Sequence, residues 1–548
     1  MFKLKNLLLP TLTGLLLWLA WPPLPFAPLL FFAFVPLLIL NDQLKHTPKA
    51  GARIFRNSFF GFFIWNTLSL YWIYNAGQEL GVAGAIGIVS VPLLLGSLLM
   101  SLPFVMFHRV RRNFGETIGL FALICCWIGY EYLHQEWQLA FPWMTLGNGL
   151  AEYHQLVQWY EYTGAFGGTL WILLANIIVY SIYKKYKLLK TEQKSLTGLS
   201  WLSIRLALHL AIPLGLSLWM YNHYQEEGNP SNVVVVQPNV DPFSEKFNGL
   251  PPEMQLERLI RLSDSLGQPN TEFFIWPETA IIPLVREDNL PYDQSVELIQ
   301  RFLSKYKNGN VLTGAVTVKW YNDKKTSTAR YNKESSRYYD VYNAGLLIEN
   351  LPKVQVYHKS KLVPGVESYP YSSVLGFLGN IVIDLGGTSG GYGKDNANPV
   401  LYTQSGIGIA PAVCYESIFG SFMADHVLRD AQLLAIITND GWWKNTSGYK
   451  QHLQYAKLRA IETRRSIARS ANTGISAFIN QRGDIIKQTS WWTQTAIKAD
   501  LNLNTKLTFY SKYGDIIAVL GSIFAFGFIM LSFLWRFISK GRPKFNTQ

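Results

Sequence analysis

Long apolar runs near both ends of the chain restrict what it can fold into. They lie within residues 1–220 and 513–537, and several approach or exceed the roughly 20 residues that an α-helix needs to cross a bilayer. Residues 222–508 instead carry charges spread throughout. The sequence therefore predicts a polytopic α-helical membrane protein with an inserted water-exposed domain. We expect eight spans, at about 7–21, 24–40, 59–74, 81–107, 118–133, 164–183, 199–221 and 516–537.

These spans divide the chain into three parts. Residues 1–221 form an N-terminal membrane region with about seven spans, and residues 222–508 form the inserted domain. Residues 509–548 form the last span and a basic tail. Two prolines separate the first two spans, which is a pattern suited to a tight hairpin in the membrane.

Basic residues predict the side of the membrane on which the inserted domain lies. Cytoplasmic loops carry an excess of lysine and arginine. If every span crosses, the basic loops all fall on one face, and they contain Lys3, Lys5, Lys45, Lys49, Arg53, Arg56, Arg109, Arg111, Arg112, Lys184, Lys185, Lys187, Lys190, Lys194, Lys540, Arg542 and Lys544. The intervening loops 75–80 and 134–163 contain no lysine or arginine. We therefore expect the inserted domain to be extracytoplasmic.

The positions of the lysine and arginine residues also indicate what kind of molecule the protein contacts. The formal net charge is +13, which would suit either nucleic acid or anionic lipid. Much of it lies beside the apolar runs, so lipid head groups are favoured and no nucleic acid is expected.

Strand-like and helix-like stretches alternate in the inserted domain, which predicts a layered α/β fold with functional residues at strand ends. We expect strands at 232–237, 272–276, 310–316, 343–349, 354–358, 433–438, 474–480 and 485–489. We expect helices at 253–267 and 295–306, and a long basic helix around 452–471. The polar stretch 322–339 looks disordered, and the glycine-rich stretch 386–393 indicates a mobile loop rather than a phosphate-binding loop.

Cys414 follows a strand of small and branched residues and is a candidate nucleophile. The other cysteines, Cys125 and Cys126, lie in a predicted span, so Cys414 has no disulfide partner in its domain. A helix from Ile418 onward would place the thiol near a helix N-terminus, where the thiolate is favoured. The alternative is an inert buried cysteine, which this stretch taken alone favours.

Two further charged residues follow predicted strands. Glu278 comes just after the apolar stretch 273–276, where a carboxylate could take a proton from a thiol. Lys359 ends another strand, where an ammonium group could stabilise an oxyanion. Taken singly, Glu278 could instead cap a helix, and Lys359 could be an ordinary surface lysine.

Together these residues resemble the Glu-Lys-Cys triad of the nitrilase superfamily. Glu278 stands in Trp-Pro-Glu, Lys359 in Tyr-x-Lys-x-x-Leu-Val-Pro and Cys414 in Cys-Tyr-Glu, in the family's order. With the membrane spans added, the whole chain resembles the bacterial apolipoprotein N-acyltransferase family. Supporting matches lie at 141–143, 163–164, 236–239, 438–443, 451–453, 459–462, Arg469 and 472–474. Two departures are Gly365-Val366, where the family has Phe-Gly, and Gly441, where it has Ala.

The resemblance implies a fold, a reaction and a set of site residues. The inserted domain would be a nitrilase-like αββα sandwich on the periplasmic side of a bacterial inner membrane. The reaction would move a fatty acyl chain from a phospholipid to the α-amine of a diacylglyceryl-cysteine at a lipoprotein N-terminus, through a Cys414 thioester. Glu278 and Lys359 would complete the triad. Glu367, Tyr415 and Glu416 would shape the site, and Trp442 and Trp443 could hold acyl chains.

Two other functions compete with this interpretation. The same triad would serve a membrane-anchored amidase that passes the acyl group to water. A transporter or lipid-binding scaffold with a degenerate domain is the second alternative, although the spans lack clear sets of paired charges. The histidines are scattered, so we expect no metal and no cofactor, and we expect a monomer.

Overall fold

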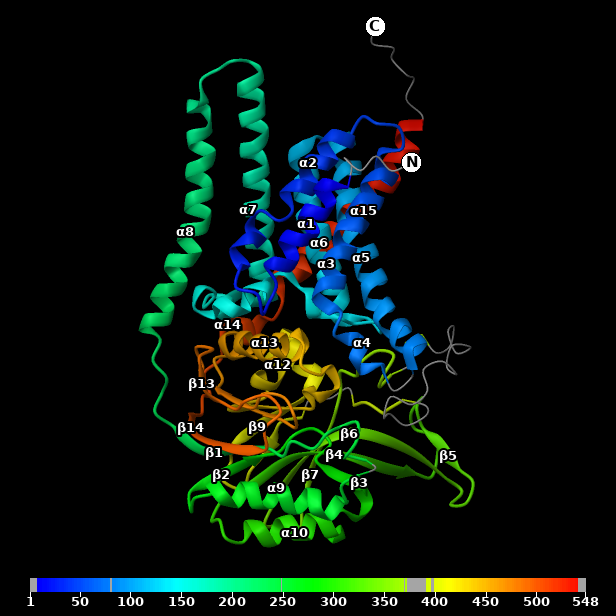
Figure 1. Cartoon of the computed structure of the whole chain (residues 1–548), viewed down its shortest axis with the longest axis vertical. Helices are drawn as coiled ribbons and strands as arrows, with labels where there is room; N and C mark the ends of the chain where they lie inside the picture. Colours follow the sequence, from blue (N-terminus) through cyan, green and yellow to red (C-terminus); the bar gives the residue numbers. More distant parts are fainter. Residues whose placement is uncertain are drawn as a thin grey trace.

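A computed structural model of the protein describes residues 7–78, 81–247, 249–368, 370–371, 391–395 and 399–540. It consists of a bundle of long helices above a domain built on two sheets (Figure 1). The chain begins in the bundle, leaves it for the sheets and returns with its last helix. This arrangement confirms the prediction of a polytopic membrane protein with an inserted α/β domain. The part of the expected basic tail beyond Lys540 lies outside the described residues, as do residues 386–390 of the expected glycine-rich loop.

In the described part of the chain, six helical segments are long and apolar enough to cross a membrane. They contain α2 (Val35–Leu44), α5 (Gly81–Phe114), α6 (Glu116–Glu136), α7 (Tyr160–Thr191), α8 (Ser200–His223) and α15 (Ile516–Lys540). Two more bundle helices are α1 (Leu8–Leu19), of 12 residues, and α3 (Ala50–Leu70), of 21 residues. The short helix α4 (Ile73–Ala76) follows α3. The structure thus supports several spans, and the count of eight stays a prediction.

Small residues let α1 and α3 pack closely. A Cβ atom added at Gly14 would lie 2.5 Å from the Gly61 carbonyl oxygen, and one added at Gly61 would lie 2.9 Å from the Pro10 oxygen. Membrane helices often rely on such small residues, because they gain little from burying apolar surface that lipid already covers.

The inserted domain contains two sheets. The larger has the order β14-β1-β2-β4-β6-β5, with β3 paired to β4 and β7 paired to β6. Its strands are β1 (Pro230–Gln237), β2 (Thr271–Ile275), β3 (Ile281–Arg286), β4 (Asn310–Tyr321), β5 (Arg330–Asn332), β6 (Arg337–Glu349), β7 (Gln355–His358) and β14 (Thr495–Asn502). The smaller sheet has the order β13-β12-β11-β10-β9-β8. Its strands are β8 (Leu401–Tyr402), β9 (Gly408–Val413), β10 (Leu433–Thr438), β11 (Ile467–Ala471), β12 (Ala477–Ile479) and β13 (Ile485–Gln488).

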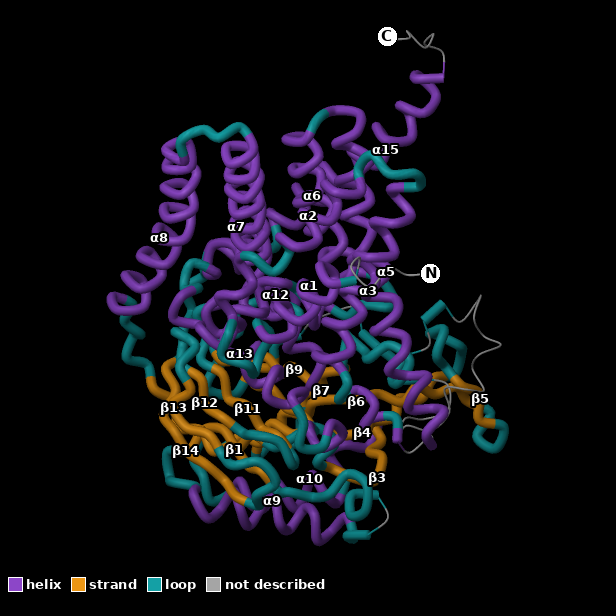
Figure 2. Tube along the Cα trace, turned by 45° about the horizontal axis from the view of Figure 1, so that its top comes forward, coloured by secondary structure: helices purple, strands orange, loops and turns teal. Residues whose placement is uncertain are grey.

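The two sheets pack face to face between two layers of helices (Figure 2). Helices α9 (Pro252–Leu266) and α10 (Gln294–Leu303) cover the larger sheet, whose inner face meets the smaller sheet through β1 and β11. Helices α12 (Gly420–Leu428) and α13 (Ser447–Thr463) cover the smaller sheet on the side of the membrane helices. The short α14 (Phe509–Tyr513) leads back to the bundle. This is the αββα sandwich that the resemblance implied.

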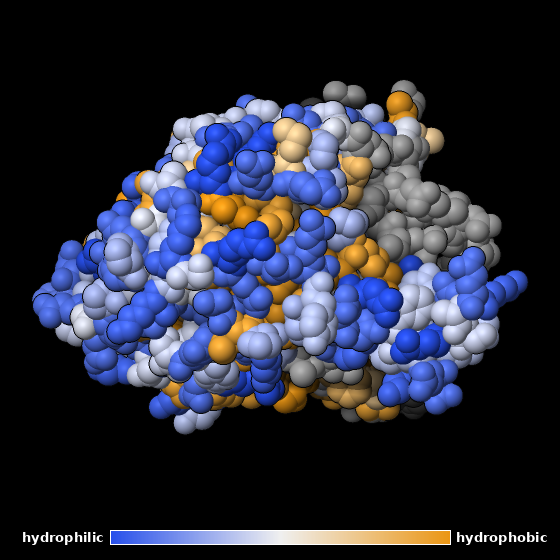
Figure 3. Space-filling view, turned by 90° about the horizontal axis from the view of Figure 1, so that it is seen from below, coloured by the Kyte–Doolittle hydropathy of each residue, from blue (hydrophilic) through white to orange (hydrophobic). Residues whose placement is uncertain are grey.

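The surfaces of the two parts differ in polarity. The end of the domain that carries α9 and α10 is predominantly hydrophilic (Figure 3). The bundle helices instead expose large apolar side chains, among them Leu94, Leu98, Ile204, Leu208, Leu520 and Phe524. These surfaces fit a bundle surrounded by lipid and a domain that faces water.

Parallel strands bring several loops to one edge of the sandwich. Strands β9, β10 and β11 are parallel, as are β1, β2 and β4. The backbone N–H of Asn239, after β1, donates to the carbonyl oxygen of Asn472, after β11. The carboxyl ends of strands from both sheets therefore meet at this edge, where ligands bind in many open α/β sheets.

The long helix expected around 452–471 is wrong in its second half. Helix α13 ends at Thr463, because Arg464 adopts a left-handed backbone with φ of 49°. Residues Ile467–Ala471 form β11, buried beside β10. Pairing within the sheet overrides the helix propensity of this stretch. The stretch 322–339, which looked disordered, contains β5 and the start of β6.

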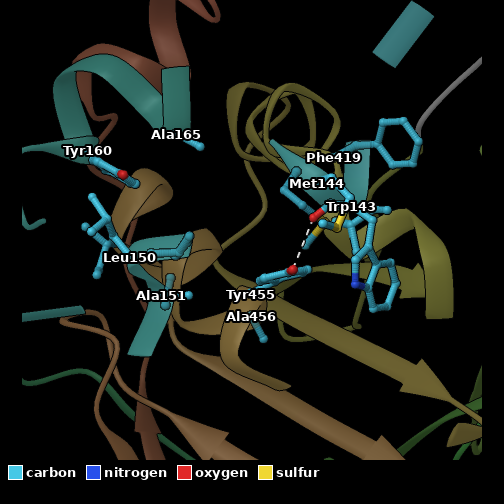
Figure 4. Packing of buried hydrophobic residues seen from close by; sticks show 14 of the residues in the cluster. Trp143, Met144, Leu150, Ala151, Tyr160, Ala165, Phe419, Tyr455 and Ala456 are labelled. Carbon is cyan, nitrogen blue, oxygen red and sulfur yellow. Dashed lines mark hydrogen bonds between the residues drawn. The ribbon is translucent and has the colours of Figure 1, made fainter. Parts of the chain in front are cut away.

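Most of helix α13 is buried, because it lies between the smaller sheet and the membrane region. The indole N–H of Trp143 donates to Oε1 of Gln451 at 2.7 Å, and Nε2 of Gln451 donates to the Pro22 oxygen at 2.9 Å. Figure 4 shows the neighbouring contact, in which the Tyr455 hydroxyl donates to the Trp143 oxygen at 3.1 Å. Polar side chains on α13 thus join the domain to the bundle.

We expect Gln451→Ala to destabilise the protein. It leaves the buried Trp143 indole N–H and the Pro22 oxygen without this partner, and each such loss costs about 1–3 kcal/mol. The thermal unfolding midpoint of the full chain in detergent should therefore fall. The matched control is Gln488→Ala, at an exposed position on β13. Equal midpoints for the two variants would contradict this role of Gln451.

Candidate functional site

Three loops at the shared strand edge bring the predicted triad together. Lys359 directly follows β7, Glu278 follows β2, and Cys414 follows β9. The Lys359 ammonium donates to Oε1 of Glu278 at 3.2 Å. The Cys414 thiol lies close enough to both groups for their charges to alter its pKa.

The Lys359 ammonium lies between two carboxylates. Besides Glu278, it donates to Oε1 of Glu367 at 2.8 Å. The amide of Asn343 donates to the same two oxygens, at 2.8 and 3.0 Å. Lys359 is 1% exposed, and burial alone would lower its pKa. The two carboxylates outweigh burial and hold the pKa of Lys359 well above its usual value, so the ammonium stays charged.

Glu367 is held by a tight turn that contains Gly365. This glycine is one of the two residues noted above as a departure from the resembled motif. Gly365 has a φ of 79°, which glycine adopts readily. The backbone N–H of Val363 donates to Oε2 of Glu367 at 2.9 Å. Glu367 therefore reaches Lys359 with Gly365-Val366 in place of Phe-Gly.

Cys414 occupies a sharp bend between β9 and a 3-10 turn over Cys414–Ile418. Its φ is 53°, a conformation that is costly for a residue other than glycine and is common at active sites. The expected help from a helix N-terminus is wrong, since α12 begins only at Gly420. Burial raises the pKa of the Cys414 thiol, the Glu278 carboxylate raises it further, and Lys359 offsets part of this. The resting group is therefore a thiol that needs a base.

Glu416 joins two segments of the site. One is the turn Cys414–Ile418, here called the nucleophile turn, and the other is the loop that follows β7 and begins at Lys359, here called the lysine loop. Oε2 of Glu416 accepts from the backbone N–H of Val413 at 2.8 Å and from the Tyr357 hydroxyl at 2.7 Å. Its Oε1 accepts from the backbone N–H of Ser360 at 2.6 Å. Burial raises the pKa of Glu416 to about 7. Its contacts are those of a group that positions Cys414 and Lys359 relative to each other.

Tyr415 joins the nucleophile turn to the membrane region. Its hydroxyl donates to the Ala140 carbonyl oxygen at 2.6 Å, in the loop that follows α6. Lys361, in the lysine loop, donates to the carbonyl oxygen of Gln135 at 3.4 Å, near the end of α6. The triad therefore lies at the junction between the domain and the bundle.

Asp440, His452 and Arg469 form a buried hydrogen-bond network behind Cys414. Each of them lies in a supporting match of the resemblance, but the sequence did not indicate that they contact one another. The Arg469 guanidinium donates to both oxygens of Asp440 and, at 2.9 Å, to Nδ1 of His452. Because a guanidinium can only donate, Nδ1 accepts and Nε2 carries the proton that reaches the Cys414 carbonyl oxygen at 3.1 Å. Burial lowers the pKa of His452, which favours this neutral form. The network fixes the backbone of Cys414.

Two residues that contact Glu278, Lys246 and Asn343, are not predicted by any sequence motif. Lys246 is 3% exposed and donates to the backbone oxygen of Glu278 at 3.2 Å, and burial lowers its pKa to about 8. Neither residue had a recognisable signal, because each lies far from the triad in sequence and in no motif of the resemblance. Among the described residues, no three His, Cys, Asp or Glu side chains are placed to hold a metal ion.

The two candidate tryptophans lie on different sides of their turn. The Trp443 ring packs against Trp72 and Trp143 of the membrane region, with centroids 4.9 and 5.6 Å away. The Trp442 ring packs against Phe243, with a centroid distance of 5.2 Å. Both are half-buried. Trp443 thus lies where the triad region meets the bundle, and Trp442 lies on the domain's own surface.

Comparisons with known proteins agree with this geometry. Residues 13–178 match the family model of the apolipoprotein N-acyltransferase N-terminal domain, and residues 235–506 match that of carbon-nitrogen hydrolases. A protein of Chlorobaculum tepidum named apolipoprotein N-acyltransferase is 32% identical over 528 residues, which cover 94% of each chain. The chain belongs to the apolipoprotein N-acyltransferase family. It is therefore an acyltransferase, and the resemblance noted in the sequence is confirmed.

Other relatives carry the same name. One from Geobacter metallireducens is 28% identical, over 94% of this chain and 92% of its own length. Another, from Allorhizobium ampelinum, is 28% identical over 88% of this chain and 87% of its own. The likeness thus extends through both the membrane region and the inserted domain.

In this member of the family, His358 fixes the end of β7 beside Lys359. Its Nε2 meets Oε1 of Glu287 at 2.6 Å, and its Nδ1 meets Oδ2 of Asp395 at 2.8 Å. The ring stacks on Tyr342 at 3.8 Å between centroids. Burial would lower the pKa of His358, but the two carboxylates raise it above its usual value. The positive charge of Lys319 acts on both carboxylates.

We expect His358 to make stability depend on pH. Its pKa is raised by folding, so its contribution is fully present below the unfolded value of about 6.5 and is lost as pH rises through the folded value. The wild type should therefore have a larger thermal-midpoint advantage over His358→Gln at pH 6 than at pH 9. A difference independent of pH would mean that the ring is neutral throughout.

Proposed function

We propose that the protein transfers a fatty acyl chain from a membrane phospholipid to the α-amine of a diacylglyceryl-cysteine at a lipoprotein N-terminus. The single observation that carries the proposal is the position of the triad, whose loops contact the end of α6 and the loop after it. An acyl donor and an acceptor that are both anchored in a bilayer would meet there in a restricted geometry. The name shared by the relatives supports the choice of acceptor.

In the first step, the Glu278 carboxylate takes the proton of the Cys414 thiol, and the thiolate attacks the ester carbonyl carbon of the phospholipid. The Lys359 ammonium and the backbone N–H of Tyr415 stabilise the oxyanion. The intermediate collapses to a thioester, and the leaving alkoxide takes the proton back from Glu278. Lysophospholipid departs, and Glu367 keeps Lys359 in place through its hydrogen bond.

In the second step, the amine of the acceptor attacks the thioester carbonyl carbon. Glu278 accepts the proton that the amine loses as the amide bond forms. The Cys414 thiolate leaves and is protonated again by Glu278. Both steps thus use one base and one oxyanion site in a ping-pong sequence. Trp443, packed against bundle residues Trp72 and Trp143, is suited to contact the acyl chains.

We propose a bacterial inner membrane with the domain on the periplasmic side. The connection from α7 to α8, which carries Lys194 and follows a lysine-rich end of α7, lies at the end of the bundle far from the sheets (Figure 1). Such a basic loop is typical of the cytoplasmic side. Glu278, Lys359 and Cys414 come from one chain, which supports a functional monomer. Residues 1–221 and 509–548 would anchor the catalytic domain 222–508.

Intact-mass analysis of the full-length protein in phospholipid micelles tests the thioester. We expect a fatty acyl mass on wild type that disappears when a diacylated lipopeptide is added, with the acyl group recovered on the peptide amine. Cys414→Ala should show no acyl mass. Cys126→Ala, which removes a buried thiol of α6, is the matched control and should behave as wild type. An unmodified Cys414 in active protein would overturn the mechanism.

We expect Glu278→Gln to slow formation of the thioester about 10²–10⁴-fold, the usual contribution of a general base. Rapid-quench measurement of lysophospholipid release isolates this step. Glu297→Gln, which alters an exposed carboxylate on α10, is the matched control. If Glu278→Gln slowed only the second step, a different group would have to deprotonate Cys414.

A further inference from the structure

A hollow of about 430 Å³ opens on the surface of the inserted domain. We call it the tryptophan hollow, and it is lined by Asp241, Phe243, Lys444, Asn445, Trp491 and Trp492. None of these residues belongs to the triad or to its hydrogen-bond partners described above. The steps of acyl transfer therefore leave the hollow unexplained.

The loops that form the hollow are immediate neighbours of the triad loops. Asp241 and Phe243 follow β1, which pairs with β2, the strand before Glu278. Lys444 and Asn445 follow β10, which pairs with β9, the strand before Cys414. Adjacent strands lie about 4.8 Å apart. Two of the loops that line the hollow thus follow strands adjacent to those that precede Glu278 and Cys414.

One loop forms a wall shared by the hollow and the catalytic base. On one side of the loop after β1, Asp241 and Phe243 line the hollow. On its other side, Val240 and Lys246 line a small cavity that also contains Glu278. A molecule in the hollow would therefore lie directly behind the loop that packs on Glu278.

The aromatic walls of the hollow are held in fixed positions. The Trp491 ring stacks on Tyr449 with centroids 4.1 Å apart. The Trp492 backbone N–H donates to the Thr473 oxygen at 3.1 Å, and its side chain stays 42% exposed. Trp492 and Lys444 have φ values of 57° and 52°. Left-handed backbone at bulky residues costs energy and is concentrated at ligand-binding sites, so an exposed tryptophan held this way points to a ligand.

The lining chemistry selects the kind of ligand. Asp241 accepts from the Phe243 N–H and the Ser244 hydroxyl, Lys444 donates to Gln78, and Asn445 accepts from the Tyr449 hydroxyl. These contacts use only part of the hydrogen-bonding capacity of the three side chains, and an acyl chain that covered them would leave the remainder unmet, which is unfavourable. A phosphate group would meet one ammonium and one carboxylate, whereas phosphate sites gather several donors and positive charges. A polypeptide offers amide donors and acceptors to the polar side chains, and side chains that pack on tryptophan.

We propose that the tryptophan hollow binds the polypeptide segment that follows the lipid-modified cysteine of the acceptor. This inference rests on the function proposed above. The acceptor has a lipid part, which belongs beside Trp443 and the bundle, and a polypeptide that has to run from Cys414 into water. Lys444 lies at the boundary between the membrane region and the water-exposed surface of the domain. Its ammonium donates to Gln78 of the membrane region at 2.5 Å, and its neighbour Asn445 is exposed.

Acceptor length provides the test. Full-length protein in phospholipid micelles is given diacylglyceryl-cysteine carrying either a long peptide or only a terminal amide. For Trp492→Ala we expect KM for the long acceptor to rise about threefold to tenfold, the usual value of an aromatic contact, with kcat unchanged. KM for the short acceptor and the rate of Cys414 acylation should not change. Asn445→Ala, at an exposed position, should act in the same direction if Trp492→Ala folds poorly.

The matched control is Tyr331→Ala, an aromatic residue of β5 that is 53% exposed and lies outside the hollow. Equal increases in KM for both acceptors would overturn the inference, because the hollow would then act on the lipid or the cysteine. Slower acylation of Cys414 in Trp492→Ala would assign the hollow to the phospholipid and would also overturn the inference. Unchanged KM and kcat for both acceptors would mean that the hollow binds neither substrate, which contradicts the inference as well. Wild type that acylates neither acceptor would instead remove the proposed function itself.

Discussion

The candidate catalytic site depends on one buried ammonium group. Lys359 is almost fully enclosed, and a lone charge in such surroundings would be strongly unfavourable. The carboxylates of Glu278 and Glu367 and the amide of Asn343 compensate that charge and share the same oxygen atoms. Once this cluster has formed, the ends of β2 and β7 are fixed relative to the middle of β6. The nucleophile can then be added from the second sheet.

A second set of contacts orients this cluster towards the bilayer. Tyr415 and Lys361 bind loop and helix-end carbonyl groups of the membrane region, and Gln451 on α13 binds Trp143 and Pro22. These contacts come from the nucleophile turn, the lysine loop and the helix layer over the smaller sheet. The membrane bundle is thus part of the structure around the candidate active site, besides anchoring it. This arrangement distinguishes the chain physically from a nitrilase domain tethered by a single helix.

The sequence predicted the features that depend on local pattern. Apolar runs indicated the membrane region, and strands such as Leu433–Thr438 were placed by their apolar residues. Three short motifs after strands singled out Glu278, Lys359 and Cys414, which the structure brings together. The errors arose where pairing between strands distant in the sequence determines the secondary structure. Ile467–Ala471 is a strand because β10 lies beside it, and Arg464 ends the preceding helix. Lys246 and Asn343 could not be found, because only the fold brings them from separate loops and strands to Glu278.

The pairing of β1 with β14 has a consequence for how the chain is made. Val233, in the first strand of the domain, lies opposite Ala499, in its last. The larger sheet is therefore incomplete along β1 until nearly the whole domain has been synthesised, and contacts so distant in sequence form slowly. Helix α15 follows only after β14 and packs on α6. The same late segment of the chain thus completes both the sandwich and the bundle, so a truncated product would lack both the final strand and the returning helix.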